Sequence, residues 1–282
     1  MQLSRRYLFH ATASALSGRI YRPQDIVLES GCASALTVAG GRHVSRVGAK
    51  QFGDVVRFGA AFTSAEGVFD DAKRAVEMTY GRVAQETLTA TTVVTSELQD
   101  LVLGVGPRLT VGHLRGTLNA KSPAAGGQPP ISVASDTVIE GVSVEGRQLL
   151  IELNLSMYQR CATLAQLLTA VDDPSFVAEH GECLFMPSAL DRLQVAAGRL
   201  VEGRGLVYGT IVKSMRWAGE PYPGAEIEQN VLTVPDIGKI FFGEILVGES
   251  HRRLTMIRFD LGSPDGGNGA GGEGQTSGGF SP

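Results

Sequence analysis

With 282 residues, of which 43% are hydrophobic, the chain is long enough to bury a sizeable core, so it is not a disordered protein. Its net charge of −4 at pH 7 is too small to indicate binding to nucleic acid or to an anionic membrane surface. Cys32, Cys161 and Cys183 are odd in number and form no Cys-x-x-Cys pair. This favours a reducing compartment over a disulfide framework, although one bridge and one free thiol would also fit.

The first segment allows two interpretations. Ser4-Arg5-Arg6 resembles the start of a twin-arginine export signal, but the residues that follow form neither a sustained apolar run nor a small-residue cleavage site. No run approaches the roughly 20 apolar residues of a membrane-spanning helix, so we expect a soluble protein that does not enter a membrane. Because the export-like start is better explained as a strand, we expect it to be cytoplasmic. Apolar residues at alternate positions instead predict a first β-strand: Tyr7, Phe9, Ala11, Ala13 and Ala15.

The same period-two pattern continues through residues 53–69 and 85–103. Threonine and valine alternate with small apolar residues in the second segment, and such β-branched side chains are typical of a sheet. One strand of that length would span roughly 60 Å, so we expect it to be bent or bulged. A pore-forming hairpin shows similar Thr-rich alternation, but an ordinary half-exposed sheet accounts for it as well.

Two stretches, residues 100–111 and 244–256, share one pattern: an acid, three apolar residues, a glycine, a turn and Arg-Leu-Thr. Each predicts a β-hairpin, and their similarity indicates an internal repeat. A third hairpin is expected over residues 139–155, with its turn at Glu145-Gly146. Further strands are expected over residues 205–216, 230–234 and 239–247. One face of the third hairpin must be covered by other elements, because it carries Leu149, Ile151, Leu153 and Leu155.

Helical signals are few. Thr163 is a candidate N-cap for a helix that ends at Val171, since apolar residues recur there at helical spacing. Residues 176–180 add one further turn, and residues 188–200 fit a short helix after Pro187.

The predicted fold is therefore mainly β, with antiparallel hairpins packed as a sandwich or jelly-roll-like pair of sheets and one or two short helices near 163–200. We divide the chain into an N-terminal β block over residues 1–156 and a second block over 157–264, which holds the helical insertion and a C-terminal β region. The two blocks are compatible with one shared core. Residues 265–282 are rich in glycine and serine and predict a flexible tail.

The most specific catalytic candidate is the pair His180 and Glu182. His-x-Glu opens the zinc deaminase signature, but the required Pro-Cys-x-x-Cys does not follow, so deaminase chemistry is excluded. A β-scaffold hydrolase or metalloenzyme that uses these two residues is kept as one alternative. The remaining histidines do not have the spacing of a metal site, and the sequence contains no nucleophile elbow and no phosphate-binding loop. We therefore predict no further catalytic residue, metal site or cofactor.

The most distinctive binding candidate is the segment 216–224. It contains Arg216, Trp217, Glu220 and Tyr222 between prolines that stiffen the backbone. Aromatic rings in a stiff loop lose little entropy when a sugar ring or a partner side chain stacks on them. The alternative is that both rings pack against the core.

These observations favour a non-enzymatic structural or interaction protein that acts through β-sheet surfaces. Its expected partner is another protein or a second copy of the chain, because long strands offer backbone edges for association. A carbohydrate-type binding module based on Trp217 and Tyr222 is the first alternative, and the enzyme based on His180 and Glu182 is the second. We expect no cofactor, metal or nucleic acid.

Overall fold

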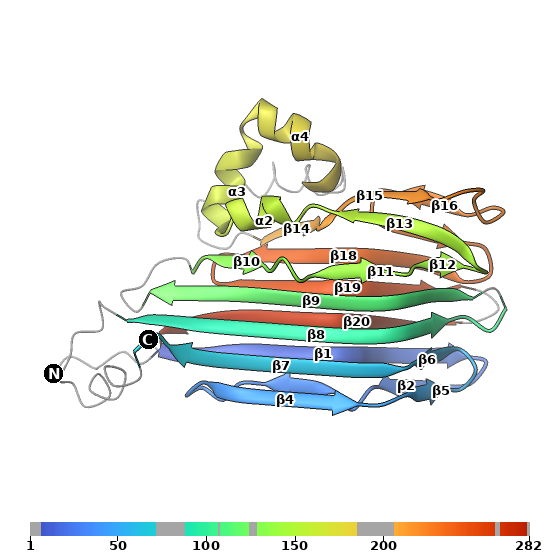
Figure 1. Ribbon diagram of the computed structural model, residues 1–282, viewed down its shortest axis with the longest axis horizontal. Coiled ribbons are helices and arrows are strands. Elements are labelled where there is room, and N and C mark those ends of the chain that lie inside the picture. Colours follow the sequence, from blue (N-terminus) through green and yellow to red (C-terminus); the bar gives the residue numbers. More distant parts are fainter. Residues whose placement is uncertain are drawn as a thin grey trace.

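The computed structural model describes residues 7–71, 88–106, 108–123, 129–184, 206–262 and 266–280. Two large antiparallel β-sheets packed face to face form most of the molecule, which confirms the predicted sandwich (Figure 1). Among the described residues there are also three short helices. None of these helices is long and apolar enough to cross a membrane.

The first sheet, called sheet A here, is built from both ends of the chain. Its strands are β1 (Tyr7–Arg22), β2 (Ile26–Glu29), β3 (Ala33–Ala35), β14 (Leu206–Thr210), β16 (Glu226–Glu228), β17 (Val231–Val234), β18 (Gly238–Gly248), β19 (His251–Leu261) and β20 (Gly266–Phe280). They are ordered β16-β17-β18-β19-β20-β1-β2, with β14 beside β18 and β3 beside β1.

The second sheet, sheet B, comes from the middle of the chain. Its strands are β4 (Gly41–Val47), β5 (Lys50–Phe52), β6 (Val56–Phe58), β7 (Ala60–Phe69), β8 (Thr89–Leu103), β9 (Leu109–Pro123), β10 (Ile131–Val133), β11 (Val138–Glu140), β12 (Ser143–Val144), β13 (Arg147–Leu153) and β15 (Val212–Trp217). The main order is β15-β13-β12-β9-β8-β6-β5, with β10 and β11 on β9 and with β7 between β8 and β4.

All three predicted hairpins are present. The two similar stretches form β8–β9 in sheet B and β18–β19 in sheet A. The third hairpin joins β12 to β13 through Glu145 and Gly146, whose φ angles of 47° and 75° are the left-handed pair that a tight two-residue turn requires. The strand predicted to continue to Leu155 ends at Leu153, because Asn154 accepts a hydrogen bond from Met157 N and so starts a helix.

In β8, the side chains alternate between the core and the outer face of the sheet, and this alternation reverses once along the strand. Asp100 in β8 has φ 52°, and the core-facing positions are even-numbered up to Leu98 and odd-numbered from Leu101 onward. Gly59, opposite Asp100, has no room for a side chain, since a Cβ there would lie 2.6 Å from Asp100 Oδ2. Strand β8 is continuous from Thr89 to Leu103, and the irregularity expected within residues 85–103 lies at Asp100.

Sheet A shows the same inversion along one row of strands. Gly243 in β18 and Gly272 in β20 have φ angles of 60° and 65° and flank Met256 of β19. As a result Met256 and its neighbour Ile257 are both fully buried. Side chains thus alternate regularly between core and surface on either side of Gly243, Met256 and Gly272, but the alternation shifts by one residue at these positions.

The flexible tail predicted for residues 265–282 is wrong. Residues 266–280 form β20, which lies in the centre of sheet A between β1 and β19 (Figure 1). Its glycines have no side chains to bury, but large neighbours fill the space above them: a Cβ at Gly269 would overlap the ring of Phe259, and one at Gly274 would lie 3.3 Å from Val94 of the opposite sheet. Glycine here permits close approach rather than flexibility.

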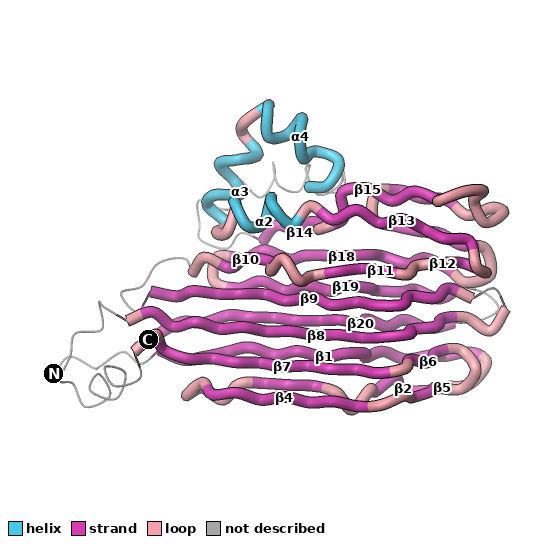
Figure 2. Tube along the Cα trace, viewed as in Figure 1, coloured by secondary structure: helices cyan, strands magenta, loops and turns pink. Residues whose placement is uncertain are grey.

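Three helices lie together at one margin of the sandwich (Figure 2). They are α2 (Leu155–Arg160), α3 (Leu164–Val171) and α4 (Pro174–Leu184). The predicted helix after Thr163 is confirmed as α3, and Thr163 forms a capping box with Gln166. Helix α4 is longer than the single turn expected, α2 was not predicted, and residues 188–200 lie outside the described residues.

Strands from both predicted blocks take part in both sheets, and one hydrophobic cluster contains residues of each. The segment expected to be one strand over residues 205–216 divides at Ile211: β14 pairs with β18 in sheet A, and β15 pairs with β13 in sheet B. The chain therefore changes sheets at this buried residue and ties the two layers together.

Candidate functional site

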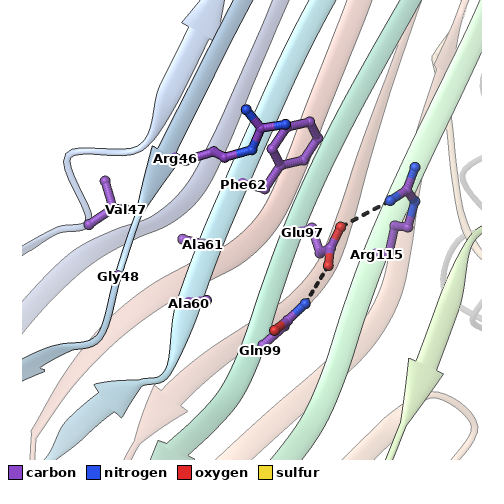
Figure 3. A pocket seen from close by; sticks show the side chains of 9 residues that line it. All are labelled: Arg46, Val47, Gly48, Ala60, Ala61, Phe62, Glu97, Gln99 and Arg115. Atoms are coloured by element: carbon purple, nitrogen blue, oxygen red, sulfur yellow. Dashed lines mark hydrogen bonds and ion pairs between the residues drawn. The ribbon is translucent and has the colours of Figure 1, made fainter.

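A hollow lies on the outer face of sheet B, across β4, β7, β8 and β9 (Figure 3). Its volume is about 490 Å³, and it opens to solvent. The floor is formed by Gly48, which has no side chain, and by Ala60 and Ala61, whose side chains are short, so a depression remains between the longer residues. The complete lining is Arg46, Val47, Gly48, Ala60, Ala61, Phe62, Glu97, Gln99 and Arg115.

One wall of the hollow is an arginine stacked on an aromatic ring. Arg46 of β4 and Phe62 of β7 are cross-strand partners, and the guanidinium carbon of Arg46 lies 4.8 Å from the centroid of the Phe62 ring. A cation–π contact of this kind contributes roughly 0.5–1 kcal/mol at an exposed site. No carboxylate of the described residues forms an ion pair with Arg46, which lines the hollow.

The opposite wall is a neutralised polar network. Glu97 Oε2 lies 3.0 Å from Arg115 Nη1, and the side chain of Gln99 donates a hydrogen bond of 2.6 Å to Glu97 Oε1. The other side of the Arg115 guanidinium pairs with Asp136 at 2.9 Å. His113 Nε2 lies 3.2 Å from Glu97 Oε1 but at an angle too poor for a hydrogen bond. Arg115 is thus fully engaged, which leaves Arg46 as the available cation of this lining.

The hollow presents few chemically reactive side chains. Among its lining residues there is no hydroxyl, thiol or amine that could act as a nucleophile. Glu97 accepts hydrogen bonds from Gln99 and Arg115, and the second of these bonds fixes the position of the Arg115 guanidinium. The hollow is therefore suited to an acidic or planar group that contacts the Arg46–Phe62 stack and rests on the small floor residues.

The outer face of sheet A carries a second charged cluster. Glu244 is buried although it points outward, and it accepts bonds of 2.8 and 3.0 Å from the guanidinium of Arg258. The hydroxyl of Tyr208 donates to the same carboxylate. Burial and the bond to Glu244 raise the pKa of Tyr208, and the bond to Glu244 raises the pKa of Arg258. All donors and acceptors at Glu244 are satisfied within the cluster, so we interpret it as structural.

The predicted loop of residues 216–224 is fixed in place. Arg147 Nη1 donates to the backbone oxygens of Glu220 and Pro221 at 3.3 and 3.0 Å. Trp217 and Tyr222 are both half-buried and pack against the main hydrophobic core. Their exposed parts remain accessible.

The other two predicted binding residues, Arg216 and Glu220, are exposed to solvent. The Arg216 side chain is exposed on β15, where it is the cross-strand partner of Leu150. The Glu220 side chain is 92% exposed, and its Oε2 lies 3.7 Å from Arg147.

The catalytic candidate His180 is buried in the helical region. Its Nδ1 lies 2.9 Å from the side-chain amide of Asn154, and its Nε2 lies 2.7 Å from Arg160 Nη2. Burial lowers the pKa of His180, which favours the neutral ring. A guanidinium beside Nε2 repels a metal cation, so the ring is placed for a structural contact. The side chain of Glu182 lies outside the described residues, and among those described no group of three or more ligands could hold a metal ion.

The sequence did not reveal the hollow because its residues come from four strands. Arg46 and Phe62 become neighbours only through the register of β4 on β7, and Glu97 and Arg115 through that of β8 on β9. None of these segments alone carries a local signal for this arrangement.

Comparisons with known proteins give a family but no individual relative. Neither the curated proteins nor the solved structures provide a match. The model of one family matches residues 7–248, from the first residue of β1 to the last of β18, and includes every strand that lines the hollow. Because this match covers well over half of the sequence, the chain belongs to the family described as a domain of unknown function (DUF8256).

Proposed function

We propose that the chain is a non-enzymatic interaction protein that self-associates through the outer face of sheet B, with the hollow at the centre of the contact. The observation that carries this proposal is the Arg46 guanidinium, which is held over Phe62 beside an open depression and has no carboxylate partner among the described residues. Arginine is among the residue types that dominate protein–protein binding energy, and both arginine and phenylalanine are enriched at the cores of interfaces.

The outer face of sheet B is a better candidate for the contact between copies than either edge of this sheet. The outer strands β4 and β15 carry exposed charged side chains, including Arg42 on the first and Lys213 and Arg216 on the second. Charges on an edge strand oppose pairing with another strand. The hollow lies inward of the β4 edge, where side chains rather than backbone groups meet a partner.

A second copy of the chain has the complementary charge. The sequence holds 29 acidic residues and 25 basic ones, so exposed carboxylates are abundant. Several of them lie on edge strands of sheet A, including Glu226 and Glu228 of β16. A carboxylate of the second copy would accept hydrogen bonds from the Arg46 guanidinium. Because the guanidinium is planar and can donate two parallel bonds, it would also orient the carboxylate.

Sedimentation velocity at increasing protein concentration tests this proposal. We expect the wild-type protein to form a concentration-dependent oligomer that Arg46→Ala and Phe62→Ala both weaken. Arg42→Ala is the matched control, because Arg42 lies on the same strand and face but pairs with Glu66 at 3.7 Å. A protein that stays monomeric at high concentration, or an oligomer that tolerates both hollow variants, would contradict the proposal.

A carbohydrate-binding role for the loop at Trp217 is the second candidate. It is supported by the two bonds from Arg147, which hold the loop in one conformation before any ligand arrives. Titration of a panel of sugars against the fluorescence of the single tryptophan tests this role. Saturable quenching that Tyr222→Ala weakens supports it, and a fluorescence that no sugar changes removes it.

A further inference from the structure

Arg252, the second residue of β19, is buried in the interior of the sandwich. Only 1% of its surface is exposed, and it is the largest of the fully buried side chains among the described residues. Its Nη2 donates a hydrogen bond of 2.6 Å to the backbone oxygen of Cys161, the residue that caps the C-terminus of α2. A cation at this end of a helix is favourable, so this bond explains how α2 is attached to sheet A.

Among the described residues, the charge of Arg252 is met only in part, by a cation–π contact with the ring of Tyr158. Its Nη1 is buried and has no hydrogen-bond partner, and no carboxylate of the described residues forms an ion pair with it. The nearest groups with an electrostatic effect are Tyr158, whose ring centroid lies 5.9 Å away, and Cys161. Burial lowers the pKa of Arg252 to about 10, so the side chain is still a cation at neutral pH.

An isolated buried cation is strongly unfavourable, and proteins normally pair it. A buried water would accept a hydrogen bond from Nη1 but would leave the positive charge in place. An anion would accept the hydrogen bond from Nη1 and would also neutralise the positive charge. The cross-strand partner of Arg252 on β20 is Thr276, which is fully buried, and its Oγ1 also has no hydrogen-bond partner. Two adjacent strands thus each direct one unsatisfied polar side chain into the same interior.

We propose that Arg252 binds a small inorganic anion, of the size and charge of chloride, enclosed between the two sheets beside α2. The anion accepts from Arg252 Nη1 and serves as the counter-ion of the core. Its role is to stabilise the fold where α2 meets sheet A, so the proposal is independent of self-association through sheet B.

Chemical unfolding in sodium chloride, compared with sodium gluconate at the same ionic strength, tests this site. Gluconate has the same charge but is too large to be enclosed. For a ligand that binds only the folded protein, each tenfold increase in chloride above its dissociation constant should lower the unfolding equilibrium constant about tenfold. Wild type should show this dependence, and Arg252→Met should lose it.

Arg253→Met is the matched control. Arg253 is the next residue, but it faces outward and pairs with Glu273 at 2.7 Å. It should keep the chloride dependence of wild type. The proposal is overturned if chloride and gluconate act alike on wild type, or if Arg252→Met responds to chloride as wild type does.

A second measurement remains decisive if Arg252→Met does not fold. Wild-type crystals grown in bromide should show an anomalous peak within hydrogen-bond distance of Arg252 Nη1. A well-ordered Arg252 with no peak beside it would also overturn the proposal.

Discussion

The glycines of β20 should be required for packing, and Gly269→Ala tests this most directly. A Cβ atom at Gly269 would overlap the ring of Phe259, which is fully buried on the neighbouring strand β19. The clash involves a large aromatic side chain in the centre of the core, so relief requires movement of the ring or of the strand. In a flexible tail the same substitution would be harmless.

The magnitude follows from two opposing effects. Glycine in a strand is less favourable than alanine by roughly 0.5–1 kcal/mol, because it loses more conformational freedom on folding. Forcing an extra carbon into a packed core costs typically 1–3 kcal/mol and occasionally more. We therefore expect Gly269→Ala to lower the free energy of unfolding by about 1–2 kcal/mol, measured by urea denaturation.

Gly266→Ala is the matched control on the same strand. A Cβ there would lie 3.7 Å from the side chain of Arg22, which is an ordinary van der Waals distance. We expect this variant to be as stable as wild type or slightly more stable. If Gly269→Ala is no less stable than Gly266→Ala, the packing explanation of β20 is refuted.

Three further predictions concern polar contacts. Glu244→Ala leaves Arg258 without its buried carboxylate and should cost about 2–3 kcal/mol in urea unfolding; an unchanged midpoint would contradict its structural role. Because burial lowers the pKa of His180, the unfolded chain takes up a proton near pH 6.5 when the folded protein does not. Stability should therefore fall as the pH drops below 6.5, and His180→Gln should show less of this loss when unfolding midpoints are compared across pH. Thr163→Ala removes the hydrogen bond of 3.1 Å to Gln166 N and should cost roughly 0.5–2 kcal/mol by the same assay; no loss would show that α3 does not depend on its cap.

Features encoded by neighbouring residues were predictable from the sequence. Alternation identified β1 and the long strand β8, and turn residues identified the hairpins. Thr163 and the apolar residues that follow it at helical spacing identified α3. In each case the signal lies within a few residues, and the folded environment agrees with it.

Features that depend on distant neighbours were not predictable in this way. The composition of β20 indicates a flexible segment, because glycine contributes no side chain to a core. The strand is nevertheless central, since Phe259 and Val94 occupy the space that its own side chains would fill. The strand register that brings Arg46 onto Phe62 is likewise set by pairing between strands and not by either segment alone.

In the proposed oligomer, the outer face of sheet B around Arg46 and Phe62 is the contact surface. Hydroxyl-radical footprinting at low and high protein concentration measures this directly, because it reports the solvent exposure of single side chains. We predict that oxidation of Phe62 falls as the oligomer forms, whereas oxidation of Tyr208, on the outer face of sheet A, stays constant. An oligomer in which Phe62 remains as reactive as in the monomer would contradict the account.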